Sequence, residues 1–440
     1  MLKRKMYQFL LDWKANKGNE CLLIKGARQI GKTFIVKEFG NNEYKSFVEI
    51  NFLKTPGLKE IFEGDLTADE IYKHMSAHMP GTRFSKDSTL IFLDEIQKCA
   101  NARTALKFLA EDGRYDIIAS GSLLGLHYGQ DADEEVEEVE SIPVGFERQV
   151  IMYSMDFEEF LWAYGYESDT IEYLRSFYEK REKVPADINE KFESILREYI
   201  VVGGMPEAVQ KFVDTKDFNE VQIVQEKILA SYDDDIALHA KGVEKVKVRA
   251  CYDSLPRQLA RENKKFKYSE VEKRGNARKF GDSITWLKDS NLVHVCYNVH
   301  EPYLPLTANS KNDEFKLYLN DSGLLLAKYG MQTKLAVLTK KIQGNAKGGI
   351  YENIISEMLI KRGYNLNYYK TQNSSMELEF VIEKDGEVVP VEVKASNSST
   401  ASLNAFIEAF HPSVSYKLID GNIGVAEGKV TLPHYMAMFI

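Results

Sequence analysis

Apolar residues in the first 120 positions occur in short runs, and helical spacing separates these runs. Four runs predict buried strands, at residues 20–24, 47–52, 89–93 and 116–119. Met6, Phe9, Leu10 and Trp13 recur at helical spacing over residues 5–16. Apolar strands that alternate with helices are typical of a parallel sheet covered on both faces. The pattern therefore predicts an α/β domain at the start of the chain.

The rest of the chain changes pattern twice. The pattern predicts helices over residues 154–240, with a break at 202–206. Over residues 250–330 it predicts two short helices followed by strands at 292–297 and 315–319. Two helices followed by two strands is the order of a winged helix. A helix at 350–361 and strands at 366–370, 378–383 and 388–394 follow, with Asp385-Gly386 as a tight hairpin turn. We expect domains at residues 1–165, 166–332 and 333–440.

Composition fits this multidomain organisation. A chain of 440 residues is too long for one hydrophobic core, and its 44% hydrophobic and 28% charged residues are ordinary for a globular protein. No apolar run is long enough to span a bilayer, and the basic N-terminus lacks a signal-peptide core. The four cysteines are widely spaced, which argues against a zinc site or a disulfide framework. We expect a cytoplasmic protein with reduced thiols and no membrane partner.

Charge is distributed unevenly along the chain. The net charge is −9, yet residues 131–140 are strongly acidic and residues 261–279 are rich in Lys and Arg. We expect the acidic run to be a solvated loop. In a winged helix, Arg278 and Lys279 would lie on DNA phosphates; otherwise the basic stretch is the solvated face of a protein–protein module. Both interpretations stay open at this point.

A phosphate-binding loop follows the first predicted strand. Gly26 and Gly31 let the backbone turn its N–H groups towards a phosphate chain, and the helix that starts at Lys32 adds its N-terminal dipole. Lys32 would reach the β- and γ-phosphates of ATP, and Thr33 would offer its hydroxyl to Mg²⁺. The expected nucleotide-binding residues are Gly26, Ala27, Arg28, Gln29, Ile30, Gly31, Lys32 and Thr33.

Acidic and hydroxyl residues end the later strands. Asp94 follows an apolar strand, where a carboxylate can hold Mg²⁺, and Glu95 can polarise the attacking water. Ser120 and Ser122 end the fourth strand. Two roles are open for these serines: they sense the γ-phosphate, or they cap the next turn. Arg148 is a candidate charge-stabilising arginine, although a surface arginine is the simpler interpretation.

Carboxylates and a lysine also gather in the C-terminal pattern. Glu392 and Lys394 are two apart on one strand and share a face; Glu379 lies on the preceding strand and Glu352 on the preceding helix. Such a group can bind Mg²⁺, with Glu379 and Glu392 as ligands, and activate water for phosphodiester cleavage. Glu-Val-Lys is also the simple pattern of a half-exposed strand.

Taken together, these segments resemble prokaryotic AAA-type P-loop ATPases that carry a C-terminal domain of unknown function (the AAA_14 and DUF4143 type). The resemblance covers nearly the whole chain. It rests on residues 26–33, 93–97, 120–125, 142–145, 155–161 and 203–207. It implies an AAA domain, a helical and winged-helix middle, and a C-terminal domain similar to the PD-(D/E)xK nuclease fold. That fold usually has Asp where this chain has Glu379, and Phe146-Glu147-Arg148 departs from the Gly-Arg that often follows Pro-Val-Gly.

Two functions agree with these observations. One is a Mg²⁺-dependent ATPase that acts on, or is regulated by, nucleic acid and ends in a nuclease-like domain. The other is a regulatory ATPase switch whose C-terminal domain only binds DNA or a protein partner. A nucleotide kinase fits less well, because it would not need two further domains. The sequence is compatible with an oligomer.

Overall fold

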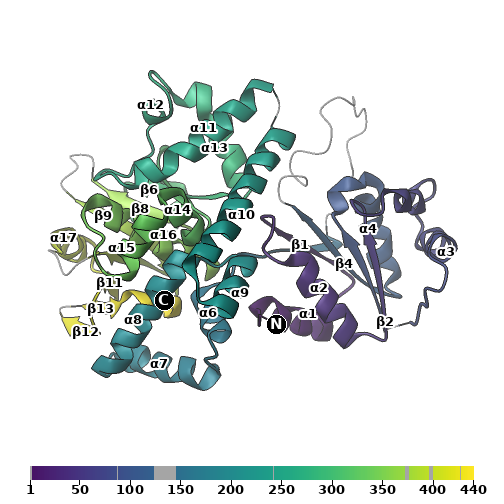
Figure 1. The fold of residues 1–440 in the computed structure, drawn as a ribbon, viewed down its shortest axis with the longest axis horizontal. Coiled ribbons are helices and arrows are strands. Elements are labelled where there is room, and N and C mark those ends of the chain that lie inside the picture. The colour runs from purple at the N-terminus through teal and green to yellow at the C-terminus, as the bar shows by residue number, and fades with distance from the viewer. Residues whose placement is uncertain are drawn as a thin grey trace.

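The computed structural model describes residues 2–86, 88–122, 145–240, 242–371, 376–395, 400–426 and 428–440. The acidic run at 131–140 lies outside these residues. Figure 1 shows the N-terminal sheet with its helices on one side of the molecule, and the helical region with the C-terminal sheet on the other.

The N-terminal part is a five-stranded parallel sheet with strand order β2-β3-β4-β1-β5. The four strands predicted from apolar runs are all present, and β5 is a fifth that the pattern did not indicate. The elements are α1 (Lys5–Asn16), β1 (Cys21–Gly26), α2 (Lys32–Glu43), β2 (Ser46–Asn51), α3 (Ala68–His78), β3 (Thr89–Asp94), α4 (Ala100–Asp112), β4 (Asp116–Ser122) and β5 (Glu147–Ile151), with 3₁₀ turns at Pro56–Phe62 and Ile96–Lys98.

Helices cover both faces of this sheet, as predicted. Successive side chains of a strand point to opposite faces. Leu22 and Ile24 of β1 therefore pack with α1 and α2, and Cys21 and Leu23 pack with α3 and α4. Because both faces are buried at the centre of the sheet, β1, β3 and β4 carry continuous apolar runs rather than an alternating pattern.

The helical middle region follows β5. Its elements are α6 (Phe157–Ala163), α7 (Ser168–Lys180), α8 (Ala186–Val202), α9 (Pro206–Thr215), α10 (Phe218–His239), α11 (Gly242–Leu259), α12 (Tyr268–Val271), α13 (Ala277–Asp289), α14 (Ser322–Tyr329) and α15 (Met331–Leu338). The break predicted at residues 202–206 separates α8 from α9. There Gly204 donates its N–H to Asp321 Oδ2 at 2.8 Å and accepts the N–H of Met155 at 2.7 Å.

We expect Gly204→Ala to lower the midpoint of urea unfolding, with a loss of roughly 1–3 kcal/mol in the free energy of unfolding. A Cβ at this position would lie 2.0 Å from the carbonyl oxygen of Met155, which is backbone and cannot rotate away. Gly57→Ala is the matched control, because nothing lies within 4 Å of a Cβ there. Equal midpoints for the two variants would contradict the close approach at Gly204.

The C-terminal part is an eight-stranded mixed sheet with strand order β12-β13-β11-β10-β9-β8-β6-β7. The helix and the three strands predicted there are present, and Asp385 and Gly386 both have positive φ in the β9–β10 turn. The elements are β6 (Val293–Val299), β7 (Ser310–Leu319), α16 (Gly344–Lys361), β8 (Asn367–Lys370), β9 (Glu377–Lys384), β10 (Glu387–Val393), α17 (Ala401–Phe410), β11 (Ser415–Ile419), β12 (Gly424–Ala426) and β13 (Lys429–Pro433), with 3₁₀ turns at Leu306–Asn309 and His434–Phe439.

The β6–β7 hairpin joins the middle region to this sheet. The helices α12 and α13 followed by two antiparallel strands reproduce the predicted order. However, β6 also pairs in parallel with β8, so strands from both sides of residue 333 share one sheet. The domain boundaries and the winged-helix assignment stay predictions.

Two predictions from composition concern the whole chain. Cys21, Cys99, Cys251 and Cys296 are buried and form no disulfide. Within the residues that the structure describes, no helix is long and apolar enough to cross a membrane.

Candidate nucleotide site

The predicted phosphate loop lies between the end of β1 and the start of α2. Gly31 caps α2 with φ +91°, a left-handed conformation that favours glycine. At Gly26, a Cβ would lie 2.3 Å from the carbonyl oxygen of Met152. Only a glycine fits this close to the Met152 carbonyl. Gly26 is therefore required by close packing, and Gly31 by its left-handed backbone conformation.

Lys32 is in the first turn of α2 and is 8% exposed. Its Nζ donates to the carbonyl oxygens of Gly26 at 3.0 Å and Ala27 at 2.8 Å, so the side chain folds over its own loop. Burial lowers the pKa of Lys32 to about 8, against the opposing effect of Glu95 and Asp94. A bound phosphate group would add negative charge beside this buried ammonium and favour its charged form.

Asp94 is the centre of a hydrogen-bond cluster at the end of β3. Its Oδ2 accepts from the Thr33 hydroxyl at 3.0 Å and from Asn51 Nδ2 at 2.7 Å, and its Oδ1 accepts from Ser120. The carboxyl ends of parallel strands meet at one edge of a sheet, which explains why residues from β2, β3 and β4 converge. The structure thus brings the two predicted Mg²⁺ residues, Thr33 and Asp94, into direct contact.

Glu95 follows Asp94 in the left-handed conformation, with φ +56°. Its Oε2 accepts from Gln97 Nε2 at 2.6 Å, and the same amide group lies 3.4 Å from Ser122 Oγ. Ser122 pairs in register with Gly26, so it lies beside the start of the loop. A left-handed non-glycine residue costs conformational energy and is often found where function requires it.

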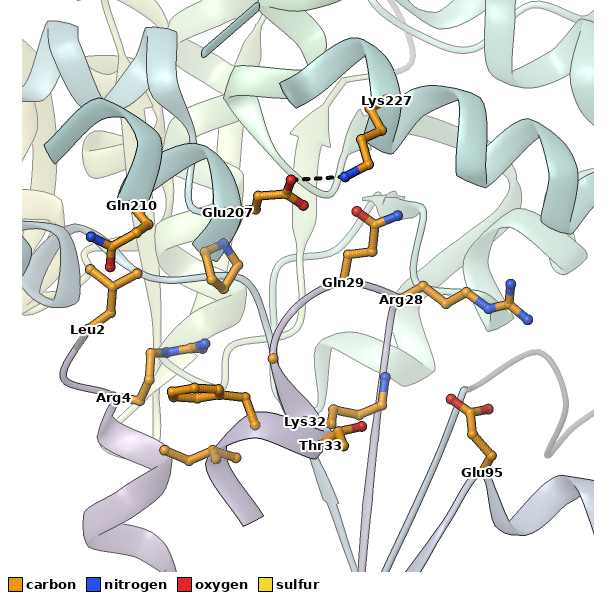
Figure 2. Close-up of a pocket in the computed structure, with 14 residues that line it drawn as sticks. Leu2, Arg4, Arg28, Gln29, Lys32, Thr33, Glu95, Glu207, Gln210 and Lys227 are labelled. Atoms are coloured by element: carbon orange, nitrogen blue, oxygen red, sulfur yellow. Dashed lines mark hydrogen bonds and ion pairs between the residues drawn. The ribbon is translucent and has the colours of Figure 1, made fainter. Parts of the chain in front are cut away.

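A cavity of about 570 Å³ opens beside this loop (Figure 2). It is large enough for a nucleotide. Its walls combine the loop and Glu95 with the N-terminal arm and helices α9 and α10; the lining residues are Leu2, Arg4, Arg28, Gln29, Gly31, Lys32, Thr33, Phe34, Ile35, Glu95, Pro206, Glu207, Gln210 and Lys227.

Several residues of the site were not predicted. Asn51 ends a strand just as Asp94 does, and that position was a signal available in the sequence. Arg4 donates to the carbonyl oxygens of Ile30 and Tyr153 and to Glu159, which ties the N-terminal arm to the loop. Asp235 of α10 pairs with Arg28. No local signal marks Arg4 or Asp235, because both reach the site only through the tertiary fold.

Arg148 lies away from the cavity. It is half-exposed on β5, pairs with Glu20 at 3.8 Å and stacks over the ring of Phe9. This placement agrees with the simpler of the two interpretations, a surface arginine.

The C-terminal sheet brings three of the four predicted residues into contact. Lys394 Nζ lies 3.3 Å from Glu379 Oε1 and 3.1 Å from Glu392 Oε1, and the Val393 N–H donates to Glu379. Burial raises the pKa values of Glu379 and Glu392, and the Lys394 charge opposes this. The pKa of Lys394 is raised, because the two carboxylates outweigh burial.

The fourth residue, Glu352 of α16, belongs to an adjoining network. It pairs with Lys264 at 2.9 Å and Lys316 at 3.8 Å and accepts from the Tyr318 hydroxyl. Burial raises the pKa of Glu379, and the negative charge of Glu352 raises it further, so the two carboxylates interact electrostatically. Across the described ranges, no group of three or more His, Cys, Asp and Glu residues is arranged to hold a metal ion.

Family models match three segments of the chain. Residues 18–161 match an AAA domain, residues 193–335 a domain of unknown function (DUF8612), and residues 347–435 a domain of unknown function (DUF4143). The N-terminal part of the chain is therefore an AAA domain that contains the P-loop, and the C-terminal part is a DUF4143 domain. The AAA match contains the whole of the loop and the Asp94 cluster.

Solved structures similar to this chain include three proteins, two of which are described as ATPases. The Walker-type ATPase PABY2304 of Pyrococcus abyssi is 14% identical, with 75% of this chain and 96% of that chain covered and a TM-score of 0.43. AMPPCP-bound DnaA from Aquifex aeolicus is 14% identical, with 65% and 88% covered and a TM-score of 0.30. A signal transduction ATPase (STAND) from Pyrococcus horikoshii is 11% identical, with 82% and 46% covered and a TM-score of 0.26. No curated protein matches the chain.

Proposed function

We propose that this protein binds ATP with Mg²⁺ at the P-loop and hydrolyses it. The observation that carries the proposal is the direct contact between Thr33 and Asp94 beside the buried Lys32. A hydroxyl and a carboxylate are oxygen ligands of the kind that Mg²⁺ takes in nucleotide sites. When bound, Mg²⁺ would neutralise charge on the phosphate oxygens.

The residues divide the chemical work between them. Lys32 and the loop N–H groups hold the phosphates, and Glu95 polarises a water molecule. The water oxygen bonds to the γ-phosphorus while the bond from that phosphorus to the β–γ bridging oxygen breaks. The water proton passes to Glu95, and ADP and phosphate leave.

Calorimetric titration with ATP and an assay of phosphate release test this function. We expect binding in the presence of Mg²⁺ and release of phosphate that stops when EDTA removes the metal. Absence of ATP binding by folded protein would contradict the proposal.

We further propose that the protein acts on nucleic acid. Lys273, Arg274 and Arg278 are exposed around the start of α13, where cations can contact DNA phosphates. The convergence of Glu379, Glu392 and Lys394 supports a nuclease-like role for the C-terminal domain. The alternative is a binding module without catalysis, and the pairing of Glu352 with Lys264 and Lys316 favours it, because those lysines neutralise charge that a metal ion would need.

Plasmid DNA incubated with Mg²⁺ or Mn²⁺, with and without ATP, separates these alternatives. For a metal-dependent nuclease we expect nicking by the wild type and none by Lys394→Ala, because Lys394 would position or help deprotonate the attacking water. Lys384→Ala, which changes a lysine at the end of β9, is the control. No nicking under any of these conditions, from protein that still hydrolyses ATP, would identify the C-terminal domain as a module without catalysis.

A further inference from the structure

The tip of the P-loop is attached to helix α10 of the middle region. Arg28 forms an ion pair with Asp235, and Gln29 Nε2 donates to Ser231 Oγ at 2.6 Å. Ser231 and Asp235 are one helical turn apart, so they share a face of α10. Two consecutive loop residues therefore contact one face of a helix that lies far away in the sequence. Gln29 and Ser231 are 202 positions apart.

Arg28 shares the electrostatic environment of the groups expected at the reacting phosphate. Its positive charge contributes to the lowered pKa of Lys32, and both Lys32 and Glu95 affect the pKa of Asp235. Burial raises the pKa of Asp235 to about 6, and the Arg28 charge opposes this. Figure 2 shows the Arg28 guanidinium, the Lys32 ammonium and the Glu95 carboxylate gathered on one side of the loop.

Arg28 is better suited to meet a phosphoryl group than the other arginine of the cavity wall. Arg4 uses Nε, Nη1 and Nη2 on Glu159, Ile30 and Tyr153, which makes it a structural tie. The Arg28 side chain is 32% exposed, while its partner Asp235 is 4% exposed. A guanidinium has five N–H donors in a planar fork, so one edge can stay on a carboxylate while another contacts a phosphate.

Given the ATP hydrolysis proposed above, on which this role rests, we propose that Arg28 is the charge-stabilising catalytic arginine, supplied by the P-loop itself, and that Asp235 positions it. Negative charge builds up on the γ-phosphoryl oxygens and on the β–γ bridging oxygen as water attacks and ADP leaves. Arg28 would contact this charge together with Lys32. Asp235 holds the guanidinium at a defined place and does not touch the substrate.

A consequence is that the AAA domain does not complete its own site. Asp235 and Ser231 lie on α10, which packs against α9, α11 and α14 of the middle region. Any change in the docking of α10 therefore moves the arginine relative to the phosphate. The rate of hydrolysis would report how the middle region is docked.

The test compares Arg28→Ala and Asp235→Asn with wild type for the dissociation constant of ATP and for kcat. We expect Arg28→Ala to lower kcat by roughly 10²- to 10³-fold while the dissociation constant changes by less than about threefold, the separation typical of a group that acts in the transition state. Asp235→Asn should lower kcat by roughly tenfold with unchanged ATP binding. Free guanidinium ion should partly restore hydrolysis by Arg28→Ala, which a merely structural role would not allow. Arg148→Ala, outside the cavity, is the matched control and should behave as wild type.

Two outcomes would overturn the role of Arg28. The first is wild-type hydrolysis by Arg28→Ala, and the second is a loss of ATP binding as large as the loss of rate, which would make Arg28 a ground-state ligand. Arg28→Gln decides the same question if the alanine variant unfolds early in a melting experiment. Failure of the ATPase function itself looks different, because the wild type would then either not bind ATP or bind it without releasing phosphate.

Discussion

Glu95→Gln is expected to bind ATP as the wild type does and to hydrolyse it roughly 10²- to 10⁴-fold more slowly, the contribution of a well-placed general base. Glu95 follows Asp94, the proposed Mg²⁺ ligand at the end of β3; it lines the cavity and accepts a hydrogen bond from Gln97. Glutamine keeps the size of the side chain and can still accept a hydrogen bond from water, but it cannot take the proton. Phosphate release under saturating ATP measures the rate, and calorimetry measures the binding.

Glu111→Gln is the control for this experiment. Glu111 is exposed on α4, and the same loss of one charge there should leave hydrolysis unchanged. A Glu95→Gln protein that turns over ATP at the wild-type rate would show that another group activates the water.

Lys32→Ala is expected to weaken ATP binding by roughly 10- to 100-fold, which corresponds to the roughly 1.5–3 kcal/mol of a hydrogen bond to a charged group. In the structure, the Lys32 ammonium lies over the loop and donates hydrogen bonds to the backbone carbonyl oxygens of Gly26 and Ala27. ATP phosphates would exchange these neutral partners for charged ones. Hydrolysis should fall at least as far as binding, because the same charge stabilises the transition state.

Titration with a fluorescent ATP analogue measures this change in affinity. Lys45→Ala is the matched control, since Lys45 is exposed before β2 and away from the cavity lining. Unchanged affinity in Lys32→Ala would remove the loop from the proposed binding mode, even if the protein still hydrolysed ATP elsewhere.

These two variants and Arg28→Ala separate three roles within one site. Lys32→Ala weakens binding and also slows hydrolysis, whereas Glu95→Gln and Arg28→Ala act mainly on the chemical step and leave binding nearly unchanged. Rescue by guanidinium then distinguishes the arginine from the base, because only the arginine variant has lost a cation that solvent can replace.

The local sequence determined the N-terminal sheet and the core of the candidate nucleotide site. Apolar runs predict strands well when both faces of a sheet are buried, because every position must then be apolar. The loop from Gly26 to Thr33 and the pair Asp94-Glu95 are consecutive residues whose roles follow from backbone geometry next to a strand end. A family model confirms the AAA domain, and in the structure the Thr33 hydroxyl donates to Asp94 at 3.0 Å.

Sequence was less informative where burial alternates or elements are short. The strand β5 is half-exposed on an edge, so it lacks the continuous apolar run of its neighbours. In the C-terminal domain, Glu392-Val393-Lys394 predicted a shared face, and Lys394 does contact Glu392 and Glu379. The ion pairs of Glu352 with Lys264 and Lys316 had no counterpart in the sequence pattern.

Only the tertiary structure determined the contacts between residues that lie far apart in the chain. Arg4, Asp235 and the lysines around Glu352 come from elements whose own patterns say nothing about the sites they reach. A periodic pattern determines which face of an element is buried, because burial is a property of single positions. It does not determine which other element covers that face, because this depends on how all the layers pack together. The phosphate chemistry proposed for this protein is therefore predictable from its sequence, while the contact between Arg28 and helix α10 is visible only in the fold.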